Sequence, residues 1–208
     1  MNKKLGIILI VSSILYILAV IIGGALKENY SHIYNSISEL SLVGTKRIFI
    51  VELLFTIYNS LLIIYSIVTL AKGKSLRKIE KVIVSLIGVC AIAGIISIIF
   101  PQEPRDATVT ISGIMHLISA GISAVTTMLT AILTYVCYIK NKDTKPYAIY
   151  SIITFIIIFI FGATGPMMIS TGIDGIFGVV ERITIGAFMI WLIVTGIQQY
   201  KNKIFLKQ

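Results

Sequence analysis

The sequence predicts an all-α polytopic membrane protein, a six-transmembrane-helix bundle with both termini cytoplasmic. Three observations support this fold class. Hydrophobic residues make up 57% of the 208-residue chain and charged residues 13%, with a mean hydropathy of +0.97, which excludes an ordinary soluble domain. Six apolar runs are each long enough to cross a hydrocarbon core of about 30 Å. Lysine and arginine collect on one side of these runs.

The runs cover Leu5–Leu26, Ile48–Ala71, Val82–Phe100, Val109–Ile139, Tyr147–Met168 and Val179–Gln199. Their short connections leave no space for a second folded domain, so we expect residues 1–208 to form a single transmembrane domain. The first run is longer than the apolar region of a signal peptide, and we therefore expect an uncleaved first helix.

The basic residues indicate the orientation. Thirteen of the 18 lysines and arginines lie on the side of the termini: Lys3, Lys4, Lys72, Lys74, Arg77, Lys78, Lys81, Lys140, Lys142, Lys145, Lys201, Lys203 and Lys207. By the positive-inside rule this side is the cytoplasm. The net charge of +9 then reflects topology and anionic lipid heads. We expect membrane lipids as partners and no nucleic acid. We also expect a location in the cytoplasmic membrane of a prokaryote, because Ile is abundant and Lys outnumbers Arg.

Most acidic residues and both histidines lie on the opposite, outer side. These residues are Glu28, Glu39, Glu52, Glu103, Asp106, Asp174, Glu181, His32 and His116. Side chains that can transfer protons or bind ligands are therefore gathered at the outer end of the bundle, which is where a functional site is expected.

The first outer segment, residues 27–47, is too polar to span a membrane and too apolar for a free loop. Its aromatic and aliphatic residues recur at mixed helical spacings, which predicts a short amphipathic piece at the outer interface. Glu52 follows about one turn into the second run. An acid at membrane depth is a functional candidate, although an ion pair with Lys46 or Arg47 explains it equally.

The third run carries small residues at three- and four-residue spacing, which allow another helix to approach closely. It ends at Phe100-Pro101, where Gln102 to Asp106 form a polar outer turn. The fifth run begins after Lys145-Pro146 and leads into a glycine-rich outer segment between Gly162 and Gly178. Glu181 and Arg182 then begin the sixth.

The fourth run is the most informative. One polar stripe follows its helical periodicity: Ser112, His116, Ser119, Ser123, Thr126, Thr130 and Thr134. Hydroxyl groups are poorly accommodated by lipid, so this face is predicted to turn into the bundle, with Ser119 and Ser123 buried and Ile118 and Ile122 facing lipid.

Three segments resemble the prokaryotic membrane family catalogued as domain of unknown function 998. They are YSHIYNSISEL, FPQEPRD followed by the inward histidine His116, and GIFGVVERITIGAFMIW. The likeness is most specific at Ser38-Glu39, at the Pro-x-x-Pro turn with Asp106, and at His116. It implies the six-helix topology and the location of the site, and it implies no reaction.

The candidate catalytic residues are Ser38, Glu39, Asp106 and His116. A hydroxyl such as Ser38 would be the nucleophile, His116 the general base, and Glu39 or Asp106 the group that orients it. This chemistry would make the protein a hydrolase-like enzyme acting on a lipid or another amphiphile in the outer leaflet. The androgen-induced fatty-acid-ester hydrolases are similar in combining an early hydroxyl residue with a later helix histidine.

The surrounding pocket or network is predicted to include Tyr30, His32, Asn35, Glu52, Arg105, Ser112, Ser119, Glu181 and Arg182. Simpler roles remain open for these groups: Ser38 and Asp106 as helix caps, Glu39–Arg182 and Glu181–Arg105 as ion pairs, and His116 as a hydrogen-bonding partner of Ser112 or Ser119. The types of residue permit zinc, but no ligand spacing motif supports it, so no metal site is predicted. The cofactor is unknown.

Two other classes of function fit the same residues. The protein could bind or move a small amphiphile or ion without chemistry, or it could be a structural membrane subunit. Its oligomeric state stays open. A cavity beside His116 with space for a ligand would favour the enzyme or the binder, and a closed network would favour the structural role.

Overall fold

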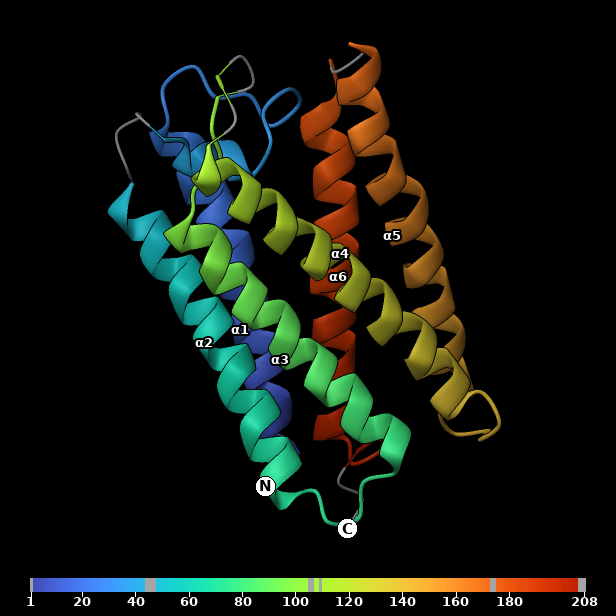
Figure 1. The fold of residues 1–208 in the computed structure, drawn as a ribbon. Coiled ribbons are helices and arrows are strands. Elements are labelled where there is room, and N and C mark those ends of the chain that lie inside the picture. Colours follow the sequence, from blue (N-terminus) through green and yellow to red (C-terminus); the bar gives the residue numbers. More distant parts are fainter. Residues whose placement is uncertain (1, 44–47, 105–106, 109, 173–174, 206–208) are drawn as a thin grey trace.

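A computed structural model of the protein describes residues 2–43, 48–104, 107–108, 110–172 and 175–205 (Figure 1). Its elements are six α-helices and one 3₁₀ helix: α1 (Asn2–Leu26), η1 (Ser38–Ser41), α2 (Phe49–Lys72), α3 (Lys78–Ile99), α4 (Ile111–Tyr138), α5 (Lys145–Thr171) and α6 (Phe177–Tyr200). Six helices are long and apolar enough to cross a membrane. The all-α, six-helix prediction is therefore confirmed.

The six helices form a closed ring. Each packs mainly against its neighbours along the chain, and α6 returns to pack against α1. The start of α1 and the end of α6 lie at the same end of the bundle, which we call the terminal end (Figure 1). The segment between α1 and α2 and the turn between α3 and α4 lie at the opposite end, which we call the site end.

Five helices extend beyond their predicted bounds by one to four residues at one end or both, and two of these differences have a clear local reason. The third begins four residues early, because the Arg77 N–H donates to the Glu80 carboxylate at 2.9 Å in a capping arrangement. The fifth continues through Pro166 to Thr171. Proline removes one helical hydrogen bond without ending a helix, a disruption that transmembrane helices tolerate. The helix stops before Gly172, whose φ of +69° suits glycine at a helix end.

The half of the ring near the terminal end is filled. Large buried side chains such as Trp191, Tyr65 and Leu192 form its core. Several polar groups among them are paired: the Trp191 indole N–H donates to Ser151 at 3.0 Å, and the Tyr65 hydroxyl donates to the Gln199 side-chain oxygen at 2.8 Å. The Gln199 amide nitrogen is buried without a hydrogen-bond partner among the described residues. This half is therefore a closed core that is mainly, but not completely, satisfied.

The polar stripe of α4 turns into the protein, as predicted. Ser119 is 1% exposed, whereas Ile118 and Ile122 are 51% and 39% exposed. Ser123 is half-buried and lines a cavity. Most hydroxyl groups of the stripe bind carbonyl groups of their own helix, as Thr130 does with Thr126 at 2.6 Å. The stripe therefore serves mainly to bury hydroxyl groups, and only the part of it nearer the site end lines the cavity.

Candidate functional site

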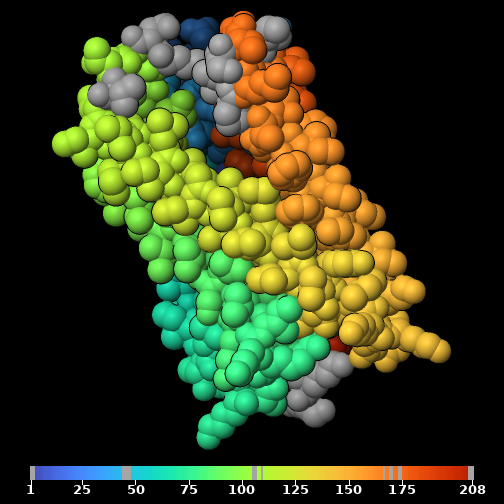
Figure 2. Space-filling model, turned by 45° about the vertical axis from the view of Figure 1, so that its right-hand side comes forward, coloured from blue at the N-terminus to red at the C-terminus, as the bar shows by residue number. Residues whose placement is uncertain are grey.

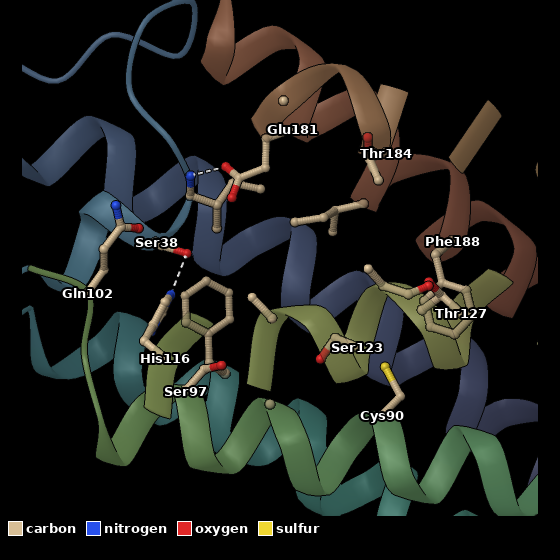
Figure 3. Close-up of a pocket in the computed structure, with 18 of the residues that line it drawn as sticks. Ser38, Cys90, Ser97, Gln102, His116, Ser123, Thr127, Glu181, Thr184 and Phe188 are labelled. Atoms are coloured by element: carbon tan, nitrogen blue, oxygen red, sulfur yellow. Dashed lines mark hydrogen bonds between the residues drawn. The ribbon is translucent and has the colours of Figure 1, made fainter. Parts of the chain in front are cut away.

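A cavity of about 510 Å³ lies inside the ring near the site end (Figure 3). This volume is within the range of small-molecule sites. All six helices and η1 contribute to its lining, which is mostly apolar. The polar side chains on the wall include Ser38, Ser41, Asn59, Gln102, His116 and Glu181.

Ser38 reaches this cavity because a buried leucine holds η1 in place. Leu40, in the same 3₁₀ helix, is fully buried in a cluster with Ile37 and Val51. Gly23 of α1 leaves the space for it, since a Cβ at Gly23 would lie 2.9 Å from a Leu40 methyl group. The hydrophobic anchor turns the polar start of η1 toward the ring interior, so Ser38 lines the cavity.

His116 approaches Ser38 from α4. Its Nε2 lies 3.2 Å from the Ser38 Oγ, and its Nδ1 lies 3.0 Å from the Phe100 carbonyl oxygen (Figure 3 shows the first contact). A carbonyl can only accept, so Nδ1 carries the proton. In the neutral ring Nε2 is then an acceptor, and the Ser38 hydroxyl donates to it.

The local sequence explains why the Phe100 carbonyl is available. If α3 continued, this carbonyl would accept from the backbone N–H of residue 104, but Pro104 has none. Other segments bind the successive carbonyl groups instead. His116 binds that of Phe100, Ser112 donates to that of Pro101 at 3.2 Å, and Val43 donates to that of Gln102 at 2.9 Å.

Glu181 and Arg182 hold the loop that carries Ser38. The Glu181 carboxylate accepts from the backbone N–H of Ile37, directly before Ser38 (Figure 3). The Arg182 guanidinium donates to the carbonyl groups of Asn35 at 2.8 Å and Gly178 at 2.9 Å, and to the Tyr30 hydroxyl. Neighbouring residues of α6 thus bind two consecutive parts of one loop.

The remaining groups of this loop form a second layer. Tyr30 donates to the Ser36 carbonyl at 2.7 Å, and the Asn35 amide donates to the Glu39 carboxylate. Partial burial raises the pKa of Tyr30 to about 12, although the Arg182 charge acts in the opposite direction. His32 lies on the exposed side with its ring edge-on to Tyr30. Partial burial and the Arg182 charge lower the pKa of His32.

The structure brings Ser38 and His116 together but gives Glu39 a different position from the orienting role considered above. The group at His116 Nδ1 is the Phe100 carbonyl, whereas the Glu39 side chain contacts Asn35. Ser119 joins α4 to α3 through Ser97 at 2.6 Å, and Glu52 lies outside the cavity lining, in the first turn of α2. Arg105 and Asp106 lie outside the described residues.

Polar parts of the site that were not predicted from the sequence include the Phe100 carbonyl, the Ser41 hydroxyl, the Gln102 amide and the Asn59 amide. The signal for Phe100 was the proline four residues later, which leaves a carbonyl without its helical donor. The signal for Asn59 was an amide inside an apolar run, where a polar side chain is costly and turns inward.

Comparison with known proteins identifies a family and no characterised relative. The model of the family described as "Protein of unknown function (DUF998)" matches residues 10–198. The chain therefore belongs to this family, which agrees with the resemblance seen in its sequence. No curated protein and no solved structure matches the chain.

Proposed function

We propose that this DUF998 protein is an integral membrane hydrolase that cleaves an ester-type bond in a lipid or another amphiphile. The observation that carries the proposal is the contact between Ser38 and His116 inside a cavity. The hydroxyl of Ser38, the nucleophile, lies 3.2 Å from Nε2 of His116, the base. The other ring nitrogen of His116 lies 3.0 Å from the Phe100 carbonyl oxygen, which orients the ring. This arrangement is the pattern of an activated serine, with a carbonyl in place of the usual carboxylate.

In the proposed reaction, the Ser38 oxygen attacks the carbonyl carbon of the substrate while its proton passes to His116 Nε2. The alcohol part of the substrate then leaves and takes that proton, so an acyl group remains on Ser38. A water molecule gives a proton to Nε2 and attacks the acyl carbon. Ser38 regains the proton as the carboxylic acid departs, and the site returns to its first state.

Gln102 is the group that we assign to the developing negative charge on the substrate oxygen. Its side chain lines the cavity beside Ser38 (Figure 3). An amide N–H is one of the donors that stabilise an oxyanion without carrying charge. The His116 ring, held at Nδ1, supports the positive charge that forms during proton transfer.

An amphiphilic substrate agrees with the chemistry of the wall. Most of the polar groups lie near Ser38, while the deeper wall is mostly apolar and includes Phe188 and Met189. We place the site in the outer half of the cytoplasmic membrane of a prokaryote, with the termini inside, on the basis of the charge distribution. A cysteine introduced at exposed Ser75 should then be shielded from impermeant reagents in whole cells, and one at exposed Glu28 should react.

Labelling with an alkyl fluorophosphonate tests the proposed nucleophile, because this reagent phosphonylates activated serines. The purified protein should gain one adduct, located at Ser38 by peptide mass spectrometry. Ser38→Ala should abolish the adduct, whereas Ser41→Ala should retain it. Ser41 is the matched control because it lies in the same 3₁₀ helix and lines the same cavity. An unlabelled wild-type protein would contradict the proposal.

His116→Asn separates a catalytic role from a structural one. The asparagine amide can still donate to the Phe100 carbonyl, but no base remains beside Ser38. We expect an unchanged melting temperature and a labelling rate lower by about 10²–10⁴-fold, the usual contribution of a general base. Labelling at the wild-type rate would show that His116 is not the base.

One observation favours a structural role as the second candidate. His116, Ser112 and Val43 each bind one of three successive carbonyls at the end of α3. This alternative predicts a lower melting temperature for His116→Ala, and no adduct at Ser38.

A further inference from the structure

We infer that the substrate is a lipid whose hydrocarbon chain reaches Ser38 sideways, from within the membrane, between the outer halves of α4 and α5. This inference rests on the proposed function, and it adds the substrate's chain and its route. It comes from the shape of the cavity wall, which opens on one side of the ring rather than closing around the site.

The opening is visible in the space-filling view. Figure 2 shows a hollow between α4, in yellow-green, and α5, in orange, through which segments of the ring interior can be seen. Several residues of α4 both line the cavity and are exposed: Leu117, which is 65% exposed, Ala120 and Gly121. Together with the hollow seen in Figure 2, their exposure indicates that the cavity meets the exterior beside this part of α4.

Both helices contribute small residues to this opening, which we call the portal. Apart from its chain neighbours and the backbone of its own helix, Gly121 has no heavy atom within 4 Å of the position where its Cβ would lie. Gly162 of α5 also lines the cavity, and its Cβ position would meet only a Thr184 methyl group, at 3.6 Å. Glycine at these positions therefore does not bring the helices together. It leaves a gap.

The path of the two helices explains why the gap lies in the outer half. α4 and α5 are joined near the terminal end by a short connection, where Tyr138 and Tyr147 pack with their ring centroids 5.8 Å apart. From there the helices diverge toward the site end (Figure 1). Side-chain packing therefore closes the space between α4 and α5 near the terminal end, and the divergence of the two helices leaves it open near the site end.

The occupant that fits this opening is a hydrocarbon chain. The portal lies within two helices that are apolar enough to cross a membrane, so its exterior is the bilayer rather than water. From His116 the cavity continues along α4 to Thr127. The two residues are eleven positions apart on the helix, a depth of about 16 Å at 1.5 Å per residue. A mostly apolar channel of this length accepts a chain while the polar end of the lipid stays beside Ser38 and Gln102.

Gly121→Trp tests the route by filling the portal. The control is Gly186→Trp on α6, because a Cβ there also meets nothing within 4 Å and Gly186 does not line the cavity. Each variant is reconstituted in phosphatidylcholine vesicles. Labelling of Ser38 is then timed with a long-chain alkyl fluorophosphonate dissolved in the bilayer and with a small water-soluble one.

If the inference is correct, Gly121→Trp slows labelling by the long-chain reagent about tenfold or more, while labelling by the small reagent stays near the wild-type rate. Gly186→Trp leaves both rates near wild type. Gly162→Phe, on the opposite side of the portal, should repeat the selective loss. A wild-type rate with the long-chain reagent, or equal losses with both reagents in both portal variants, would overturn the route.

A second measurement does not depend on Ser38 chemistry. A phosphatidylcholine with a photoreactive group near the end of one chain should cross-link to cavity residues of the wild-type protein around Thr127, and Gly121→Trp should remove this cross-link. Cross-linking without any Ser38 adduct would contradict the proposed hydrolase function but support the portal as the route of the lipid chain. A Ser38 adduct with cross-linking unaffected by Gly121→Trp would contradict the portal alone.

Discussion

Gly6 of α1 and Gly196 of α6 face each other at the contact that closes the helical ring. A Cβ at Gly6 would lie 2.4 Å from the Gly196 carbonyl oxygen, and a Cβ at Gly196 would lie 2.5 Å from the Gly6 carbonyl oxygen. Both obstacles are backbone atoms, which cannot rotate away. The first and last helices therefore pack at a distance that only glycine permits at these two positions, as small residues do between membrane helices.

Gly6→Ala and Gly196→Ala should each destabilise the protein, because either methyl group forces α1 and α6 apart. We expect a loss of about 1–3 kcal/mol, the usual cost of overpacking, seen as a lower melting temperature in detergent. Gly186→Ala is the control, since its Cβ position is open. A wild-type melting temperature for Gly6→Ala would contradict the close packing of the ring.

Arg182→Lys should loosen the loop that carries Ser38. The guanidinium reaches two carbonyl groups and the Tyr30 hydroxyl at once, and a lysine ammonium cannot reproduce this fork. Loss of a hydrogen bond to a charged group costs about 1.5–3 kcal/mol. We expect faster amide hydrogen exchange in residues 30–41 and slower fluorophosphonate labelling of Ser38.

Arg77→Lys is the control for that measurement, because Arg77 lies near the terminal end and also has several partners: Glu80 and both the carbonyl and the sulfur of Cys137. It should lower the melting temperature without changing exchange in residues 30–41. Equal exchange in Arg182→Lys and the wild type would show that Arg182 does not hold the loop.

Glu103 should give stability a measurable dependence on acidic pH. Its carboxylate accepts from the Thr110 N–H at 3.0 Å, directly before α4, and from the Thr110 hydroxyl. These bonds hold the pKa of Glu103 below its ordinary value of 4.5. The native state then binds the proton less tightly than the unfolded state, so the stabilisation is complete above the ordinary pKa and is lost as the pH falls through the native one.

Melting temperatures of the wild type and Glu103→Gln, measured from about pH 7 to about pH 3, test this effect. The advantage of the wild type should shrink as the pH falls, and Thr110→Val should remove part of the same pH dependence. The two proteins are compared because other carboxylates titrate over this range. An advantage that stays constant or grows on acidification would contradict the role assigned to Glu103.

The sequence by itself determined the six helices and the face that α4 turns inward. Both follow from local properties, because a run of apolar residues must form a helix to satisfy its backbone in lipid. A hydroxyl stripe at helical spacing must turn away from that lipid. The distribution of charged residues indicated the end of the bundle at which a site was expected, and the family resemblance singled out Ser38 and His116 among its polar groups. The predicted end of α5, Met168, is three residues too early, because the apolar run ends there while the helix continues to Thr171.

Only the tertiary structure decided which of these groups meet. Ser38 and His116 are 78 residues apart in the chain, and their contact depends on where Leu40 anchors η1 and how α4 tilts across the ring. The Phe100 carbonyl is a backbone group, so the type of residue at this position does not indicate that it binds His116. The proposed portal exists because α4 and α5 are joined at one end and diverge toward the other. Hydrophobic patterning determines which residues are buried, whereas the distances between polar groups on different segments are determined by how the helices pack around the ring.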